Sequence, residues 1–122
     1  MSENEDLIQQ FCAAWSRRDI DELLAFFTED AVYHNIPIEP VSGHEGIRNM
    51  LQLFIPASHE ISFEVRNVAS SGDVVFTERV DRFAMVERTV ELPVAGVFEI
   101  RDGKIAAWRD YFDLGTWLRQ TT

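Results

Sequence analysis

The order of apolar patterns along the chain limits the folds that it can adopt, because helical periodicity comes first and strand alternation follows. Apolar residues recur at helical spacing across 7–15, 20–27 and 47–54, so each stretch forms one apolar face. Asp19 is a plausible N-cap for the helix expected at 20–27. A short strand is expected at 31–36. The first half of the chain is therefore predicted to be mainly helical.

Strand patterns fill the second half, where apolar and polar residues alternate between turn signals. The predicted strands cover 61–65, 74–86, 89–100 and 105–113. A bulge or bend is expected near Pro93 or Gly96. Helices followed by hairpin-linked strands predict a single α+β domain over residues 1–122, with about three helices on one face of a curved, mostly antiparallel sheet. Such a cone-like sheet can enclose a pocket beneath its helices.

Ionisable residues lie on otherwise apolar strand faces. Side chains alternate along a strand, so Arg79 and Asp81 share one face of their strand. Asp110 shares a face with Trp108 and Phe112. A carboxylate in apolar surroundings costs roughly several kcal/mol unless it is paired. Two such carboxylates, with one arginine that can bridge them, indicate a site that uses them.

An arginine between two aspartates predicts that the two acids differ in protonation state. The guanidinium can hold both by charge-assisted, bidentate hydrogen bonds. Burial and like charge raise one carboxyl pKa while the arginine lowers the other, so an acid and a base coexist at neutral pH. This division suits general acid–base catalysis. Tyr33 and Asn35 share a strand face, and both can hydrogen-bond a water molecule on which the pair would act.

The acidic composition narrows the possible partners. A formal net charge of −10, from 21 acidic and 11 basic residues, argues against nucleic acid and against an anionic membrane surface. A neutral or apolar small molecule is the expected partner. Cys12 is the only cysteine and is expected to be a small core residue. Without a signal peptide or an apolar run near the roughly 20 residues of a membrane span, a cytoplasmic protein is expected.

Structural roles are the alternative interpretation for each of these residues. Most Asp–Arg neighbours on strands are surface ion pairs, Tyr33 could be a core-edge aromatic, and Asn35 could be a turn residue. The histidines His34, His44 and His59 lack the spacing of a metal site. The chain also lacks a glycine-rich phosphate loop and a G-x-S-x-G motif. A metal site is therefore not expected.

Three segments of the chain carry a family resemblance. They are YHNIPIEP at 33–40, TERVD at 77–81, and GVFEI at 96–100 continuing through GKI at 103–105 to WRDYFDL at 108–114. Together they resemble the limonene-1,2-epoxide hydrolases, in the superfamily of nuclear transport factor 2 that also contains ketosteroid isomerases and polyketide cyclases. The resemblance implies a six-stranded, mixed, strongly curved sheet with helices that close a deep pocket, usually in a dimer. It also implies one-step opening of an epoxide by water, with no covalent enzyme intermediate and no cofactor.

The resemblance also assigns roles where the motifs match. Asp110 would be the general base that takes a proton from the attacking water, and Tyr33 and Asn35 would hold that water. Asp81 would be the protonated acid that donates to the epoxide oxygen. Arg79 would bridge the two aspartates and keep their protonation states apart.

Apolar side chains are expected to form the pocket for a small, largely apolar epoxide such as that of a cyclic monoterpene. The predicted substrate-contacting residues are Trp108, Phe112, Ile36 and Phe83. Further aromatic candidates for the pocket are Trp15 and Phe76. The expected product is a vicinal diol, and the expected assembly is a homodimer.

The same residues leave two other functions open. An isomerase or cyclase would use Asp110 or Asp81 to move a carbon-bound proton on a ketone-bearing substrate, and Asp81 could then be the oxyanion donor. A non-catalytic binding or dimerisation module would keep the ion pairs for structure alone. Diol release from epoxides, conversion of enones, and the behaviour of Asp→Asn variants separate the three.

Overall fold

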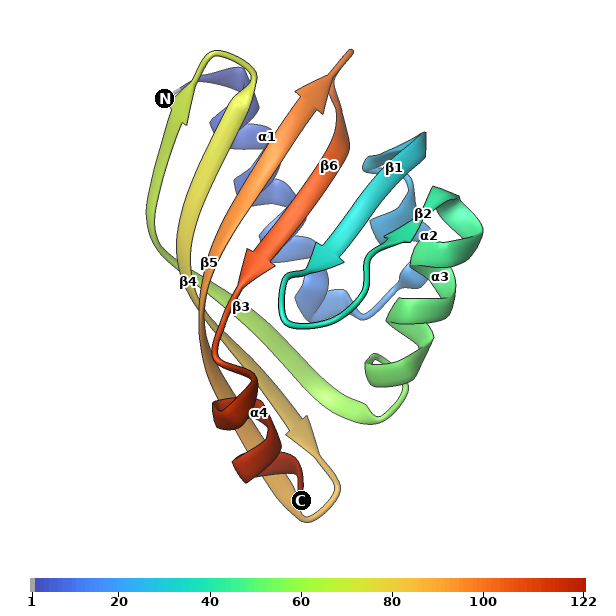
Figure 1. The fold of residues 1–122 in the computed structure, drawn as a ribbon, viewed down its shortest axis with the longest axis vertical. Helices are drawn as coiled ribbons and strands as arrows, with labels where there is room; N and C mark the ends of the chain where they lie inside the picture. The colour runs from blue at the N-terminus through green and yellow to red at the C-terminus, as the bar shows by residue number, and fades with distance from the viewer. Residues whose placement is uncertain (1) are drawn as a thin grey trace.

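A computed structural model describes residues 2–122 as one curved, six-stranded sheet with helices packed against it (Figure 1). The helices are α1 (Glu3–Ala14), α2 (Ile20–Leu24), α3 (Gly43–Phe54) and α4 (Leu114–Thr121), and the 3-10 turn η1 (Trp15–Arg17) follows α1. The strands are β1 (Phe27–Asn35), β2 (Val41–Ser42), β3 (Ser58–Ser71), β4 (Val74–Met85), β5 (Arg88–Arg101) and β6 (Lys104–Tyr111). This architecture confirms the predicted α+β class with a curved, mixed sheet, which does not close into a barrel.

Strand pairing brings distant parts of the chain together. The order across the sheet is β2-β1-β6-β5-β4-β3, and among the described residues β1 and β6 form its parallel pair. In this pair Tyr33 lies beside Trp108, and Asn35 lies beside Asp110. The pairing therefore places the two polar residues of β1 next to a carboxylate that is far away in sequence.

Capping side chains explain where α2 and α4 begin. Asp19 accepts a hydrogen bond from the Glu22 amide at 3.1 Å, as expected of the predicted N-cap. Helix α4 was not predicted, and the last strand, which was predicted to extend to residue 113, ends at Tyr111. Instead, the Asp113 carboxylate accepts a hydrogen bond from the Thr116 amide at 3.0 Å and starts a helix of eight residues. Such a short helix gives a weak periodic signal, and it depends on packing against β5.

β5 has no bulge near Pro93 or Gly96, where a bulge or bend was predicted. β5 runs through Pro93 and Gly96 without a register shift against β4, and the shift that does occur lies between Glu99 and Ile100 where β5 pairs with β6. Pairing with β6 begins only at Ala95. Among the described residues, no strand therefore pairs with Pro93 on the β6 side of β5. The lack of a backbone N–H in proline costs no strand hydrogen bond on that side.

β1 begins earlier than predicted, at Phe27 rather than at residue 31. Phe27 pairs with Ile105, and the Ile105 amide donates to the Phe26 carbonyl oxygen at 2.8 Å. Phe27 therefore belongs to the sheet and not to α2, which ends at Leu24.

An aromatic core fills the space between α1 and the concave face of the sheet. Phe11 makes edge-to-face contacts with Trp15, Phe27, Phe98 and Trp108, at centroid distances between 5.1 and 6.2 Å. Cys12 lies in this core as predicted, and burial raises the pKa of its thiol to about 12. Within residues 2–122, no helix combines the length and the apolarity needed to cross a membrane.

Candidate active site

Three adjacent strands supply a buried polar cluster on the concave face of the sheet. β4 contributes Thr77, Arg79 and Asp81, and β6 contributes Asp110. Gly96 of β5 lies between them, because it pairs with Thr77 on one side and with Asp110 on the other. The side chains alternate along each strand as predicted, so the charged groups share the buried face.

Arg79 binds both carboxylates at once. Its Nε and Nη2 donate to Asp81 at 3.0 and 2.9 Å, and its Nη1 and Nη2 donate to Asp110 at 3.2 and 2.7 Å. Nη1 also donates to the Thr77 hydroxyl at 3.1 Å. All four residues are buried, with at most 4% of their surface exposed. The predicted bridge between the two aspartates is therefore present, and the ion pairs are not surface pairs.

Aromatic rings enclose the guanidinium of Arg79. Its central carbon lies 4.9 Å from the ring centroid of Phe63 and 5.9 Å from that of Trp108. Both distances allow a cation–π attraction, which is stronger where water is excluded. The rings thus help to hold a cation in a part of the molecule that is otherwise apolar.

Trp108 orients Asp110, which differs from its predicted role in substrate contact. Its indole nitrogen donates to Asp110 Oδ1 at 2.6 Å, and the side chain is fully buried. The ring stacks on Tyr33 with 4.2 Å between centroids and on Phe98 with 5.5 Å. Because both faces of the ring are covered, Trp108 does not line the cavity.

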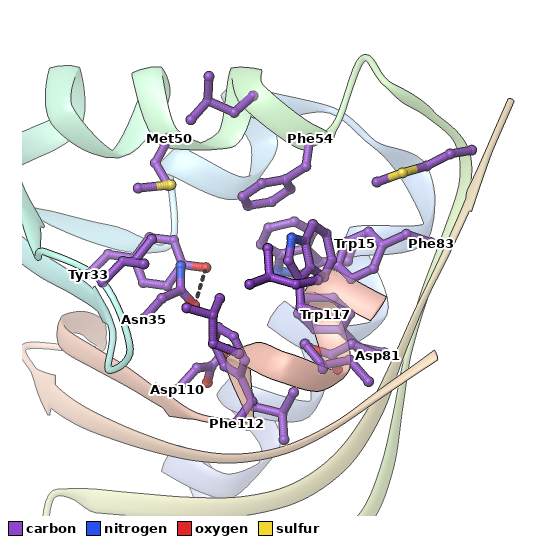
Figure 2. Close-up of a pocket in the computed structure, with 18 residues that line it drawn as sticks. Trp15, Tyr33, Asn35, Met50, Phe54, Asp81, Phe83, Asp110, Phe112 and Trp117 are labelled. Atoms are coloured by element: carbon purple, nitrogen blue, oxygen red, sulfur yellow. Dashed lines mark hydrogen bonds between the residues drawn. The ribbon is translucent and has the colours of Figure 1, made fainter. Parts of the chain in front are cut away.

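Tyr33 and Asn35 lie next to Asp110, as the prediction of a water-holding pair requires. The Tyr33 hydroxyl donates to the Asn35 side-chain oxygen at 3.3 Å. The amide of Ile36 donates to the backbone carbonyl of Asp110 at 2.9 Å and fixes the end of β1 against β6. Tyr33, Asn35 and Asp110 all line the cavity (Figure 2), and Asn35 is the strand neighbour of Asp110.

Burial shifts the titration of this cluster. It raises the pKa of the Asp81 carboxyl to about 6, while Arg79 acts to lower that pKa and the charge of Asp110 adds to the rise. Burial would lower the pKa of Arg79, but the charges of Asp110 and Asp81 raise it well above its ordinary value. Burial and the charge of Asp110 raise the pKa of Tyr33, so its hydroxyl stays protonated. Asp81 is thus a carboxyl that can carry a proton near neutral pH.

A cavity of about 350 Å³ opens beside the cluster. Figure 2 shows Met50 and Phe54 reaching toward it from α3, while Phe112 and the two aspartates lie on its other side. The polar groups at its wall come from Tyr33, Asn35, Asp81 and Asp110. The other lining residues are apolar: Trp15, Ile38, Met50, Leu53, Phe54, Phe63, Phe83, Met85, Leu92, Val94, Phe112, Leu114, Trp117 and Leu118.

Only some of the residues predicted to line the pocket do so. Phe83, Phe112 and Trp15 line the cavity, but Ile36 does not. Because Tyr33 and Asn35 face inward, alternation turns Ile36 to the opposite side, and Ile38 of the following loop takes the place at the cavity. Phe76 is 45% exposed on the outer face of the sheet.

Sequence reasoning missed two groups of residues at the site. Thr77 and Gly96 also belong to the polar cluster. Alternation with Arg79 was the signal for Thr77, whereas Gly96 is identified only by its cross-strand neighbours Thr77 and Asp110. The second group consists of cavity walls from α3 and α4, namely Met50, Leu53, Phe54, Leu114, Trp117 and Leu118. Strand and helix periodicity predicts which residues are buried, but not which helix covers the open end of the sheet.

Gly96 leaves the space that the polar cluster occupies. A Cβ atom at this position would lie 2.4 Å from Arg79 Nη1, 2.8 Å from Thr77 Oγ1 and 2.9 Å from Asp110 Oδ1. These atoms are held by buried hydrogen bonds, so they cannot move without breaking the cluster.

Gly96→Ala is therefore expected to lower the free energy of unfolding by about 1–3 kcal/mol through overpacking. Urea denaturation measures this change. Gly46→Ala is the matched control, because its Cβ would come no closer than 3.5 Å to Val41 and alanine favours a helix interior. Unchanged stability of Gly96→Ala would show that the cluster does not need this space.

No group of three or more His, Cys, Asp or Glu side chains within residues 2–122 is arranged to hold a metal ion. The acidic groups at the cavity instead bind Arg79.

Comparison with solved structures first defines the class of fold. An NTF2-like protein of unknown function from Burkholderia pseudomallei K96243 superposes with a TM-score of 0.88 at 21% identity, over 100% of this chain and 99% of that one. At this identity the likeness shows the fold alone. The chain therefore has an NTF2-like fold whose pocket ends in a buried Asp–Arg–Asp cluster.

Closer relatives define the family within that class. The family model described as the limonene-1,2-epoxide hydrolase catalytic domain matches residues 2–122. Epoxide hydrolase EphG of Mycobacterium tuberculosis (strain ATCC 25618 / H37Rv) is 32% identical over 109 residues, which is 88% of this chain and 71% of the relative. A solved M. tuberculosis LEH-like epoxide hydrolase superposes with a TM-score of 0.80 at 30% identity, over 98% of this chain and 92% of that one. The chain belongs to the limonene-1,2-epoxide hydrolase family, which confirms the resemblance found in the sequence.

Proposed function

We propose that the protein is an epoxide hydrolase that adds water in one step to a small, largely apolar epoxide and releases a vicinal diol. The observation that carries the proposal is the arrangement at the end of the apolar cavity: Tyr33 and Asn35 lie beside Asp110, and Arg79 links Asp110 to Asp81. The relatives named as epoxide hydrolases support the same class of reaction.

The first half of the proposed reaction activates water. Tyr33, Asn35 and Asp110 hold one water molecule, and Asp110 takes a proton from it as its oxygen attacks an epoxide carbon. Trp108 donates to one oxygen of Asp110 and fixes the direction of the carboxylate. Holding the water and the epoxide in one geometry removes much of the entropic cost of their encounter.

The second half opens the ring. Asp81, with its pKa raised to about 6, donates its proton to the epoxide oxygen as the carbon–oxygen bond breaks. The product carries one hydroxyl from water and one from the epoxide. A proton then returns from Asp110 to Asp81 through water and restores the starting state.

Arg79 keeps the charge of the cluster low through the cycle. With one proton shared by the two aspartates, the charges of Arg79, Asp81 and Asp110 sum to zero, so the apolar surroundings hold no net charge. In the ring-opening step Asp110 gains one proton and Asp81 loses one, so the number of protons on the two aspartates stays the same. The guanidinium bonds both carboxylates before and after the transfer and needs no rearrangement.

The direct test of this proposal is diol formation from a panel of cyclic and linear epoxides. The same protein is assayed against enones, because an isomerase or cyclase would convert these instead. Diol release from at least one apolar epoxide is expected. Enone conversion without any diol would overturn the proposal.

The pH dependence of the rate follows from the raised pKa of Asp81. Only the protonated acid can donate, so activity is lost as the pH rises through this pKa. We expect kcat/KM to fall about tenfold for each pH unit above about 6. Circular dichroism at each pH checks that the protein stays folded, and a flat profile up to pH of about 8 would contradict the role of Asp81.

We also propose that the protein is a homodimer and works in the cytoplasm. Phe76 of β4 and Tyr111 of β6 are 45% and 46% exposed on the outer face of the sheet, on the two strands that flank β5, and a second copy could cover them. Light scattering coupled to size exclusion tests the assembly, and the mass of a single chain would contradict it.

A further inference from the structure

Three exposed apolar side chains mark the mouth of the cavity. Ile38 of the loop after β1 is 42% exposed, Leu53 of α3 is 71% exposed and Leu118 of α4 is 46% exposed. Each of the three also lines the cavity. A side chain that borders both the cavity and the solvent lies at the opening, so these residues form an apolar rim.

The rim differs in chemistry from the inner end of the cavity. The ionisable residues at the cavity wall are Tyr33, Asp81 and Asp110, and each is at most 4% exposed. Among the lining residues there is no lysine or arginine. The outer part of the cavity therefore offers hydrocarbon contacts and no partner for a charged group.

We propose that the rim binds the distal hydrocarbon part of a substrate that is longer than the cavity. The substrate class is then an uncharged epoxide with an extended apolar skeleton, whose reactive end reaches the aspartates while its other end covers Ile38, Leu53 and Leu118. This proposal deepens the proposed function and rests on it for the reactive end. Its support is that Ile38, Leu53 and Leu118 belong to a cavity wall that is apolar apart from Tyr33, Asn35, Asp81 and Asp110.

The contribution of the rim can be measured by varying the length of the hydrocarbon chain of the substrate. Each methylene removed from water tightens binding by about three- to fourfold. A long terminal epoxide therefore gains from the rim, whereas a short one that stays inside the cavity does not.

The experiment compares 1,2-epoxydodecane with 1,2-epoxyhexane through the ratio of their kcat/KM values. The wild type is measured beside the double variant Leu53→Gln, Leu118→Gln, since glutamine is polar but has a helix preference close to that of leucine. Val86→Gln is the matched control, because Val86 is 79% exposed and lies outside the cavity. The ratio is expected to fall about tenfold in the double variant, as several methylenes lose apolar contact, and to stay at the wild-type value in the control.

Two outcomes overturn the proposal. One is an unchanged ratio in the double variant. The other is a change in molar mass of the double variant on size exclusion, which would make the rim an interface between copies of the chain.

Failure of the proposed function is recognised separately. If neither epoxide yields a diol, hexanamide and dodecanamide are titrated against tryptophan fluorescence, because Trp15 and Trp117 line the cavity. Tighter binding of dodecanamide that is lost in the double variant supports the rim. Equal binding of both amides overturns it.

Discussion

Asp110→Asn is expected to lower the rate of epoxide hydrolysis by about two to four orders of magnitude, the usual contribution of a general base. The amide keeps the size of the carboxylate and can still accept the hydrogen bond from Trp108, but it cannot take a proton from water. Initial rates of diol formation at saturating enzyme measure the loss. Circular dichroism shows whether the variant keeps its fold.

Asp102→Asn is the matched control for this change. Asp102 is exposed in the turn between β5 and β6 and has a positive φ of 53°, which asparagine also adopts readily. The control should keep the wild-type rate. A rate near that of the wild type in Asp110→Asn would remove Asp110 from the role of base.

Arg79→Met is expected to lower the free energy of unfolding by about 3–5 kcal/mol, because it leaves two carboxylates buried without their partner. The cost arises from the unpaired charges rather than from lost packing, since methionine fills a similar volume. The triple variant Arg79→Met, Asp81→Asn, Asp110→Asn removes those charges and should recover much of the loss. Urea denaturation with comparison of m-values measures both variants.

Arg82→Met is the control for the loss of one arginine from the same strand. Arg82 pairs with Glu64 and Glu91 on the solvent side, so its replacement should change stability little. If the triple variant were no more stable than Arg79→Met, the cost would lie in packing and not in uncompensated charge.

The sequence predicted the polar residues that meet at the site better than the apolar residues that form the cavity wall. Strand alternation placed Arg79, Asp81 and Asp110 on buried faces, because a period of two residues fixes the side to which each side chain points. The same rule placed Tyr33 and Asn35 together. These predictions depend only on local geometry, and the structure confirms the placement of all five residues.

Residues whose role depends on strand register or on helix docking could not be placed in this way. Trp108 shares a face with Asp110 as predicted, yet stacking against Tyr33 and Phe98 removes it from the cavity. A bulge or bend was predicted near Pro93 or Gly96, whereas the need for glycine at 96 comes from its cross-strand neighbours. These contacts arise only when distant segments pair, and no periodicity along one strand encodes them.

The C-terminal helix shows the same limit. α4 brings Leu114, Trp117 and Leu118 to the cavity, but a helix of eight residues gains its stability from the sheet on which it packs. Its N-cap Asp113 is visible in the sequence only once a helix is expected there.

Direct attack by water on the epoxide is tested by a single turnover in oxygen-18 water. Enzyme in excess over the epoxide is mixed in labelled water, and the diol is analysed by mass spectrometry. We expect the diol of the first turnover to carry one labelled oxygen, because that oxygen comes from the water held by Tyr33, Asn35 and Asp110. An unlabelled diol, with the label appearing in a carboxylate of the protein, would contradict it.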